Sequence, residues 1–334
     1  MQNRVQLNRV QLTDLSNDRD GSIVGWMEDD GVYKVSTQKK GQKVIFNQDC
    51  SGMFYGGEFC CDDIELSKRH ESEMKEVYFN NVDTSKVTNM ARMFDHCKQL
   101  LKLDLSNFDT SNVKIMHGMF EGCSKLEHLK LSGFDTPNVV DMSEMFSSCG
   151  NLRELDLSHF DTSKVKNMSG MFGWCNKLEH LNLGGFDTPN VVNMSEMFTC
   201  CKNLKELDLS SFDTSSVAYM NLMFDSCEKL KNLDLSRFNT YRVKTMAWMF
   251  CECRNLESLK LNKCKLGNTV NLNGIFAGCD KFTSLETTDI HLQNEYQKEV
   301  VQKQNKMHSN IDLNNLKING EKVKQKEKGI DKEK

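Results

Sequence analysis

Hydrophobic residues recur along this chain with a period of 26. Phenylalanine, cysteine and leucine each return at the same place in eight successive units. The phenylalanine ladder runs from Phe94 to Phe276 and the leucine ladder from Leu103 to Leu285, in step with Cys97, Cys123, Cys149, Cys175, Cys201, Cys227, Cys253 and Cys279. A fixed period of this length predicts a solenoid, in which each unit buries its apolar side against its neighbours.

The hydrophobic period changes within each unit. In residues 101–106 leucines alternate with polar residues, which is the two-residue period of a strand with one buried face. In residues 113–123 the apolar residues fall on one stripe of an α-helix. Thr110 suits the N-cap of that helix, and the two prolines of the chain follow the equivalent Thr136 and Thr188. The pattern predicts an α/β solenoid of about eight strand–helix coils.

The segments that flank the repeats differ from them in pattern. We expect an N-terminal extension over 1–22, a cap over 23–76, the solenoid over 77–285, a capping helix over 286–308 and a charged, disordered tail over 309–334. The cap contains a predicted hairpin of VYKVS and KVIFN around Gly41 and a degenerate first coil. Inside the solenoid, residues 127–146 nearly recur at 179–198. This second period of 52 indicates duplication of a pair of coils.

The unit FDTSxVxxMxxMFxxCxxLxxLDLS resembles the 26-residue repeat of the BspA-like leucine-rich-repeat surface and lipoprotein family. The segments GWMEDDGVYKVS and KVIFNQDCSGMF resemble the part that precedes those repeats, so that the resemblance covers residues 23–285. It implies a right-handed leucine-rich-repeat solenoid and a role in binding or adhesion, commonly at a cell surface. It supplies no catalytic residues.

Charge and motifs exclude several classes of function. The 334 residues carry 43 Lys and Arg against 47 Asp and Glu, which gives no general attraction for nucleic acid or anionic membrane. No apolar run is long enough for a transmembrane helix, and no secretory signal is visible. These two features indicate a cytoplasmic protein, whereas the family resemblance indicates the cell surface. Motifs such as GxSxG, HExxH and the P-loop are missing from the sequence. We expect a non-enzymatic protein without a cofactor; hydrolysis at an unrecognised site is the weaker alternative.

The cysteines of the ladder share their apolar stripe with methionine and phenylalanine, where a thiol behaves as a small hydrophobe. Stacked neighbours that point the same way suit a disulfide poorly. The other six lack the CxxC pairs of a zinc site; they are Cys50, Cys60, Cys61, Cys200, Cys251 and Cys264. We therefore expect core packing, and a reducing compartment.

A further ladder is acidic, and each member precedes the expected helix start: Asp83, Asp109, Asp135, Asp161, Asp187 and Asp213. A helix N-terminus favours an anion by about 0.3–1 kcal/mol, which is comparable with a repulsion of roughly 0.8 kcal/mol between carboxylates stacked about 5 Å apart in water. Helix capping is thus sufficient to explain the ladder. Calcium, which needs about six to eight oxygens for each ion, is the alternative ligand.

The outward side chains of the strands form the candidate binding surface, because a solenoid commonly binds there. They are polar and acidic on balance, without the aromatic platforms that suit sugars or the basic stripe that suits phosphates. Their histidines lie too far apart for a ligand set. The expected partner-binding residues are Lys102, Asp104, His128, Lys130, Glu154, Asp156, His180, Glu206, Asp208 and Asp234.

The sequence therefore predicts a scaffold that binds a protein partner of basic or mixed charge on its concave strand face, centred on Asp104, Asp156, Asp208 and Asp234. Simple solvation of these strand residues explains their polarity equally well. A cell-surface adhesive or structural protein, exported by a route that the chain does not show, is the alternative function.

Overall fold

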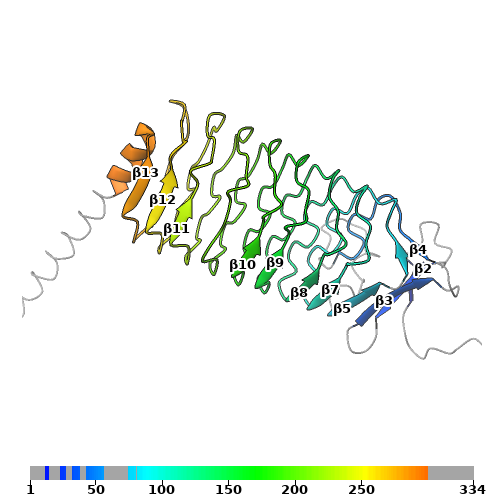
Figure 1. The fold of residues 1–334 in the computed structure, drawn as a ribbon. Coiled ribbons are helices and arrows are strands. Elements are labelled where there is room, and N and C mark those ends of the chain that lie inside the picture. Colours follow the sequence, from blue (N-terminus) through cyan, green and yellow to red (C-terminus); the bar gives the residue numbers. More distant parts are fainter. Residues whose placement is uncertain are drawn as a thin grey trace, which may run out of the picture. The chain divides into compact units, whose positions relative to one another are not determined.

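The computed structural model describes residues 12–14, 23–27, 32–37, 43–55, 74–79 and 81–299. The chain forms two compact units that divide between Asp289 and Ile290. The first unit is a row of stacked coils (Figure 1). The second contains a helix over residues 290–299, within the expected capping segment. The expected tail, residues 300–308 and most of the expected N-terminal extension lie outside the described residues.

Strands in the described part of the first unit are short. They are β1 (Leu12–Asp14), β2 (Ile23–Met27), β3 (Val32–Thr37), β4 (Val44–Ile45), β5 (Glu76–Phe79), β6 (Val82–Asp83), β7 (Lys102–Asp104), β8 (His128–Lys130), β9 (Glu154–Asp156), β10 (His180–Asn182), β11 (Asn232–Asp234), β12 (Ser258–Leu261) and β13 (Ser284–Thr287).

Strands one repeat apart pair in parallel, with equivalent residues side by side. In this way β7 pairs with β8, β9 with β10, and β12 with both β11 and β13. The leucine ladder is in register, since Leu103 lies beside Leu129 and Leu155 beside Leu181. The central residue of each strand thus faces the core and its two neighbours face outward, as the two-residue period predicts.

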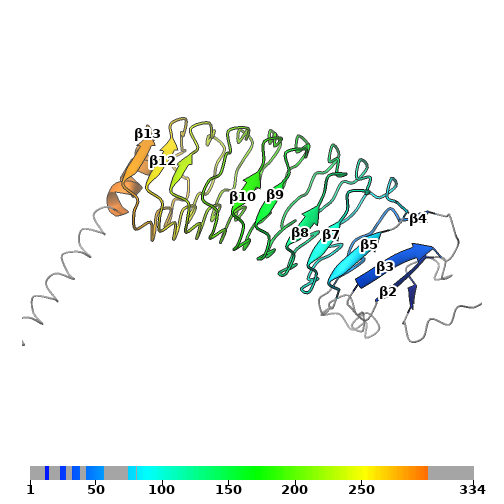
Figure 2. The ribbon, with the colours of Figure 1, turned by 60° about the horizontal axis from the view of Figure 1, so that its bottom comes forward.

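The N-terminal strands continue this sheet (Figure 2). β2 pairs antiparallel with β1 and β3, and β3 pairs in parallel with β5. The hairpin of this region therefore joins β2 to β3, and the predicted pairing of VYKVS with KVIFN is wrong. β4 pairs with β6 instead, because Val44 and Phe46 turn inward and Phe46 packs edge-on against Phe79 and Phe108 in the solenoid core.

The second half of each unit is not helical, so the expected α/β class is wrong and the solenoid is built from strands and turns. Residues 113–123 contain turns and one bridge residue, Ile115, which forms isolated parallel bridges with Asn89 and Asp141. Two residues four apart, Gly118 at φ 57° and Gly122 at φ 69°, adopt the left-handed region, which ends a right-handed helix. The N–H of Met116 donates to the carbonyl oxygen of Asp141 in the next coil, at 2.9 Å, and not four residues back as in a helix.

The apolar stripe nevertheless identifies the buried side of each coil. Val113, Met116, Met119, Phe120 and Cys123 are all inaccessible to solvent. Phenylalanines of the ladder stack face to face along the core, as at Phe120 and Phe146, whose ring centroids are 5.5 Å apart. Turns between short bridged segments repeat the three- and four-residue spacing of a helix, which explains why the stripe predicts burial correctly and conformation wrongly.

The cysteine ladder belongs to the same core. Its side chains are buried, and each donates to the carbonyl oxygen of a phenylalanine one coil earlier, as Cys123 Sγ does to Phe94 at 3.0 Å. Burial raises the pKa of the Cys175 thiol to about 12. The cysteines in the described part of the chain form no disulfide, and the expected core packing of the ladder is confirmed. Cys60 and Cys61 lie outside the described residues.

Threonines that we expect to cap helices instead join one coil to the next. Because no helix follows, the hydroxyl of Thr136 is directed to the following coil, where it donates to the carbonyl oxygen of Asp161 at 2.9 Å. Four aspartates of the ladder cap turns, as Asp161 Oδ1 does by accepting the backbone N–H of Ser163 at 2.9 Å; the others are Asp83, Asp109 and Asp213. The Ser163 hydroxyl and this backbone contact lower the pKa of Asp161. The ladder therefore has a structural role in turns.

Candidate functional site

Nine of the ten expected partner-binding residues line two grooves on the strand face of the first unit. The main groove takes in Lys130, Glu154, Asp156, His180, Glu206 and Asp208. The second takes in Lys102, Asp104, His128 and again Lys130. Asp234 lines neither groove; it accepts the N–H of Ser236 at 3.0 Å and faces Lys260 Nζ at 3.8 Å. The expected centre of four aspartates is thus divided among three places.

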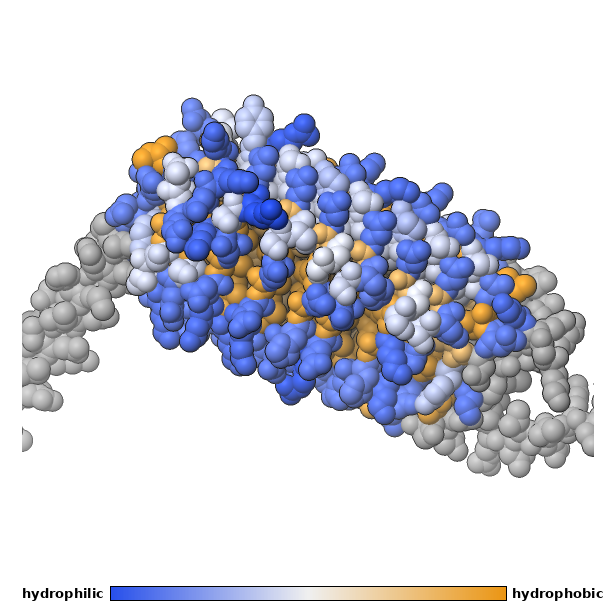
Figure 3. Space-filling view, in the orientation of Figure 1, coloured by the Kyte–Doolittle hydropathy of each residue, from blue (hydrophilic) through white to orange (hydrophobic). Residues whose placement is uncertain are grey.

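The main groove has a volume of about 1030 Å³ and crosses β8, β9, β10 and the next coil at residues 205–208. Leucines of the strands form its floor, and of these Leu129, Leu181 and Leu207 are partly exposed. Figure 3 shows a band of apolar surface between rows of hydrophilic side chains along the coils. The groove therefore offers an apolar surface to a ligand on an otherwise polar face.

This groove lies where the strand ladder is interrupted. Between the described strands β8 and β9 no pairing forms, and residues 206–208 of the following coil are not in a strand. Three leucines beside these gaps are partly exposed, namely Leu129, Leu181 and Leu207, whereas Leu103 inside the ladder is 2% exposed. The floor of the groove is therefore most open to solvent at these three leucines.

Two glycines mark places where neighbouring coils approach each other very closely. Gly133 and Gly185 follow β8 and β10, and a Cβ on either residue would lie 2.1 Å from the carbonyl oxygen of Ser106 or 1.9 Å from that of Ser158. The coil between them carries His159 at this position, and its Nε2 donates to the carbonyl oxygen of Leu131 across the β8–β9 gap at 3.0 Å. The 52-residue period is therefore visible at this position, where Gly133 and Gly185 come close to the preceding coil and His159 between them spans an unpaired junction.

On the rim of the main groove, carboxylates outnumber the basic side chains that could neutralise them. Glu179 pairs with Arg153 at 2.8 Å and with Lys205 at 3.9 Å. Lys130 is engaged by Asp104 of the second groove at 3.0 Å. Four groove carboxylates form no ion pair within the part of the chain that the structure describes: Glu154, Asp156, Glu206 and Asp208.

Hydrogen bonds keep the two aspartates of this group charged. The side chain and backbone of Ser158 lower the pKa of Asp156, and the backbone and side chain of Ser210 lower that of Asp208. Each aspartate therefore caps its own turn and still presents charge on the strand face.

The second groove, of about 470 Å³, is balanced in charge. Lys102 Nζ lies 3.4 Å from Glu76, whose carboxylate also accepts the hydroxyl of Tyr78 at 2.9 Å. Asp104 is paired with Lys130 at 3.0 Å. Because these charges are satisfied within the protein, the second groove has less to offer a charged ligand.

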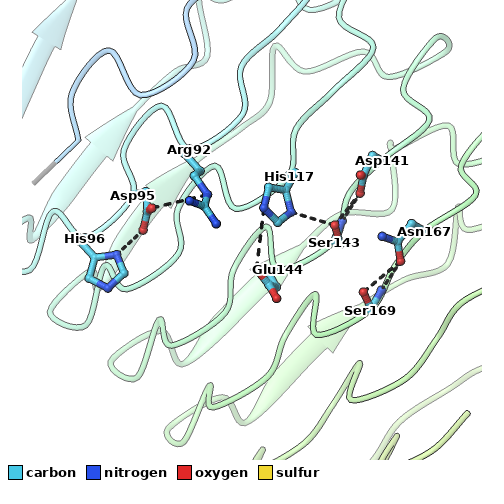
Figure 4. Close-up of polar contacts among 9 residues, drawn as sticks. All are labelled: Arg92, Asp95, His96, His117, Asp141, Ser143, Glu144, Asn167 and Ser169. Carbon is cyan, nitrogen blue, oxygen red and sulfur yellow. Dashed lines mark hydrogen bonds and ion pairs between the residues drawn. The ribbon is translucent and has the colours of Figure 1, made fainter. Parts of the chain in front are cut away.

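A charged cluster that the sequence analysis missed lies at the turns before the cysteine ladder (Figure 4). Asp95 is buried beside His96 and 3.9 Å from Arg92, and burial raises the pKa of its carboxyl group. His117 contacts Ser143 Oγ at 2.9 Å and lies 3.9 Å from Glu144. Comparison of neighbouring repeats would have placed part of this cluster, because His117 and Ser143 occupy the same position of successive units.

Metal binding finds no support in this cluster or elsewhere in the described residues, where no three His, Cys, Asp or Glu side chains are grouped to hold an ion. His128 and His180 line different grooves, as their spacing predicts. Within the same ranges, no helix has the length and apolar character needed to cross a bilayer.

Several solved structures of bacterial repeat proteins are similar to this chain. A leucine-rich cell surface protein of Faecalibacterium prausnitzii is 13% identical, with coverage of 84% of this chain and 96% of that one and a TM-score of 0.30. A leucine-rich repeat protein of T. pallidum is 18% identical, with coverage of 83% and 92% and a TM-score of 0.33. These low scores support no inference about a shared partner. No curated protein matches the sequence.

A family model matches the repeats themselves, over residues 48–181 and 174–289, which together make up well over half of the chain. That family is described as Mycoplasma protein of unknown function, DUF285, and it is of the BspA type that the repeat motif resembles. The chain belongs to the DUF285 family.

Proposed function

We propose that this protein is a non-enzymatic scaffold that binds a protein partner on the strand face of its solenoid, through the main groove. One observation carries the proposal: the groove combines a partly exposed leucine floor with four carboxylates that form no ion pair within the described part of the chain. An apolar centre inside a polar rim is the usual composition of a protein interface.

The polar residues of the groove support binding more than catalysis. Ser132 and His159 both line it, but the His159 ring spans the β8–β9 gap to the carbonyl oxygen of Leu131. The aspartates cap turns through Ser158 and Ser210. The aspartate contacts repeat from coil to coil, whereas an active site needs one unique arrangement.

Site-specific photo-crosslinking tests the proposal in the native cells. A photoreactive amino acid at Lys205, on the rim of the main groove, should form a discrete covalent adduct with a protein partner. The same amino acid at Lys114, exposed beside the bridge residue Ile115 and outside the groove, is the matched control. Adducts from Lys114 alone, or from neither position, would contradict binding in the groove.

An adhesive or structural protein at the cell surface is the second candidate function, and membership of a BspA-type family favours it. Protease treatment of intact cells separates the two proposals. Degradation of the protein on intact cells supports a surface function, while protection until the cells are lysed supports a scaffold inside them.

A further inference from the structure

We infer that the main groove takes an extended peptide segment in which two basic side chains flank an apolar one. The inference rests on the proposed function and specifies the chemistry of the partner. It follows from three features of the groove: the position of its exposed leucines, the spacing of its unpaired carboxylates and the contrast with the second groove.

The leucine floor defines where an apolar side chain would bind. Leu181 is central, with Leu155 of β9 on one side and Leu207 of the following coil on the other. Leu181 and Leu207 are partly exposed because the strand ladder ends between them. An aliphatic side chain placed over Leu181 would cover apolar surface that the protein itself leaves open to water.

Unpaired carboxylates lie on both sides of that position. Glu154 and Asp156 belong to β9, and Glu206 and Asp208 to the coil two repeats on. Two strand spacings amount to about 10 Å, and alternate side chains of an extended peptide share one face at a spacing of roughly 6.6 Å. An apolar residue over Leu181, with lysine or arginine two positions before it and two positions after it, would therefore direct all three side chains into the groove and bring each long basic side chain to one carboxylate pair.

The charges of the groove select the sign of the ligand. Five carboxylates and two lysines line it, and those lysines are already engaged by Glu179 and Asp104. An acidic segment or a phosphate backbone would meet the unpaired carboxylates and be repelled, whereas a basic segment would pair with them.

Binding of synthetic peptides, followed by fluorescence anisotropy, tests the inference on the full chain. The probe peptide has two lysines four positions apart with a leucine midway between them, so that all three side chains share one face of the extended peptide. One control peptide has glutamates for the lysines, and another has serine for the leucine. We expect the full chain to bind the probe at least about tenfold more tightly than either control, and more weakly as salt is raised.

Variants of the protein test whether the probe binds in the main groove. A variant in which all four unpaired groove carboxylates are replaced should bind the probe at least about tenfold more weakly. Its substitutions are Glu154→Gln, Asp156→Asn, Glu206→Gln and Asp208→Asn. The matched control is Glu76→Gln, since this carboxylate occupies the strand position equivalent to Glu154 but is paired with Lys102 outside the main groove. It should change the affinity by less than about twofold. If the variant with four substitutions folds poorly, the double variant Glu154→Gln with Glu206→Gln takes its place, because it leaves every aspartate cap intact. The double variant should still weaken binding of the probe severalfold.

Three results would overturn the inference: no binding of the probe, equal binding of the glutamate peptide, or full affinity in the folded variants without groove carboxylates. The crosslinking experiment keeps the proposed function separate. If Lys205 forms an adduct with a partner but the probe does not bind, the scaffold function stands and the basic segment is wrong. If neither occurs, both proposals fail.

Discussion

The hydroxyl group of Thr110 makes two hydrogen bonds with the backbone of Asp135, one coil further on. It donates to the carbonyl oxygen of Asp135 at 2.6 Å and accepts the N–H of the same residue at 2.9 Å. Thr110 is fully buried, and equivalent threonines repeat the contact along the stack, for example Thr162 with Asp187. One side chain in each coil thus satisfies two backbone groups of its neighbour.

Thr110→Val should destabilise the protein by about 1–3 kcal/mol, because the substitution keeps the shape but leaves a buried donor and acceptor unpaired. Urea unfolding followed by circular dichroism measures this change. Ser132→Ala, which removes an exposed hydroxyl, is the control and should stay within about 0.5 kcal/mol of the native protein. Equal midpoints for Thr110→Val and the native protein would show that the contact contributes nothing.

Gly185→Ala should cost about 3 kcal/mol or more. The added methyl group would lie 1.9 Å from the carbonyl oxygen of Ser158, and backbone atoms cannot move away as a flexible side chain can. Gly267→Ala is the matched control, because a Cβ there meets no atom within 4 Å. Similar melting temperatures for the two variants would contradict the close junction between the coils of β9 and β10.

Thiol labelling should distinguish two classes of cysteine in the folded protein. Alkylation at mildly alkaline pH, mapped by mass spectrometry, should modify the half-buried Cys200 and Cys251 well before the ladder. Cys149 and Cys175 should react only after unfolding, since burial both shields these thiols and raises their pKa. Labelling of Cys149 in the folded chain as fast as Cys200 would be inconsistent with the core. After denaturation without reductant, all 14 cysteines should react.

The pH dependence of stability should reflect the aspartate caps. The pKa of Asp161 is lowered from 3.8 in the folded protein by Ser163, so its contribution is present above pH 3.8 and is lost as the pH falls through the folded value. Asp161→Asn should therefore reduce the loss of stability on acidification, measured as urea midpoints at neutral pH and below pH 3.8.

Asp95 gives the opposite sign and serves as the comparison. Burial raises its pKa from 3.8, so that above this value ionisation favours the unfolded chain and stability falls until the pH passes the folded pKa. Asp95→Asn should remove this fall in stability. On acidification the variant should therefore lack the gain in stability that protonation of Asp95 gives the native protein. The same pH response in both variants would contradict the assigned environments.

The repeat and its buried face are predictable from the sequence, because burial follows the spacing of apolar residues whatever the local conformation. The helix is not. Trp174 and Leu222 adopt the left-handed region at φ 60° and 58°, although neither residue type favours it, since hydrogen bonds between coils determine the backbone there. Likewise, the alternation of apolar and polar residues locates the outward side chains of the strands. Only the structure shows that Asp104 forms an ion pair and that Asp156 forms none within the described residues.

The recurrence of the close contact at Gly133 and Gly185 also has an evolutionary consequence. Because these glycines occur 52 residues apart, a pair of coils is the smallest cassette whose gain or loss preserves this order. Insertion of such a cassette would lengthen the leucine floor of the strand face. Lineages that expand or contract the array in this way would alter the length of segment they recognise without having to reinvent the recognition chemistry.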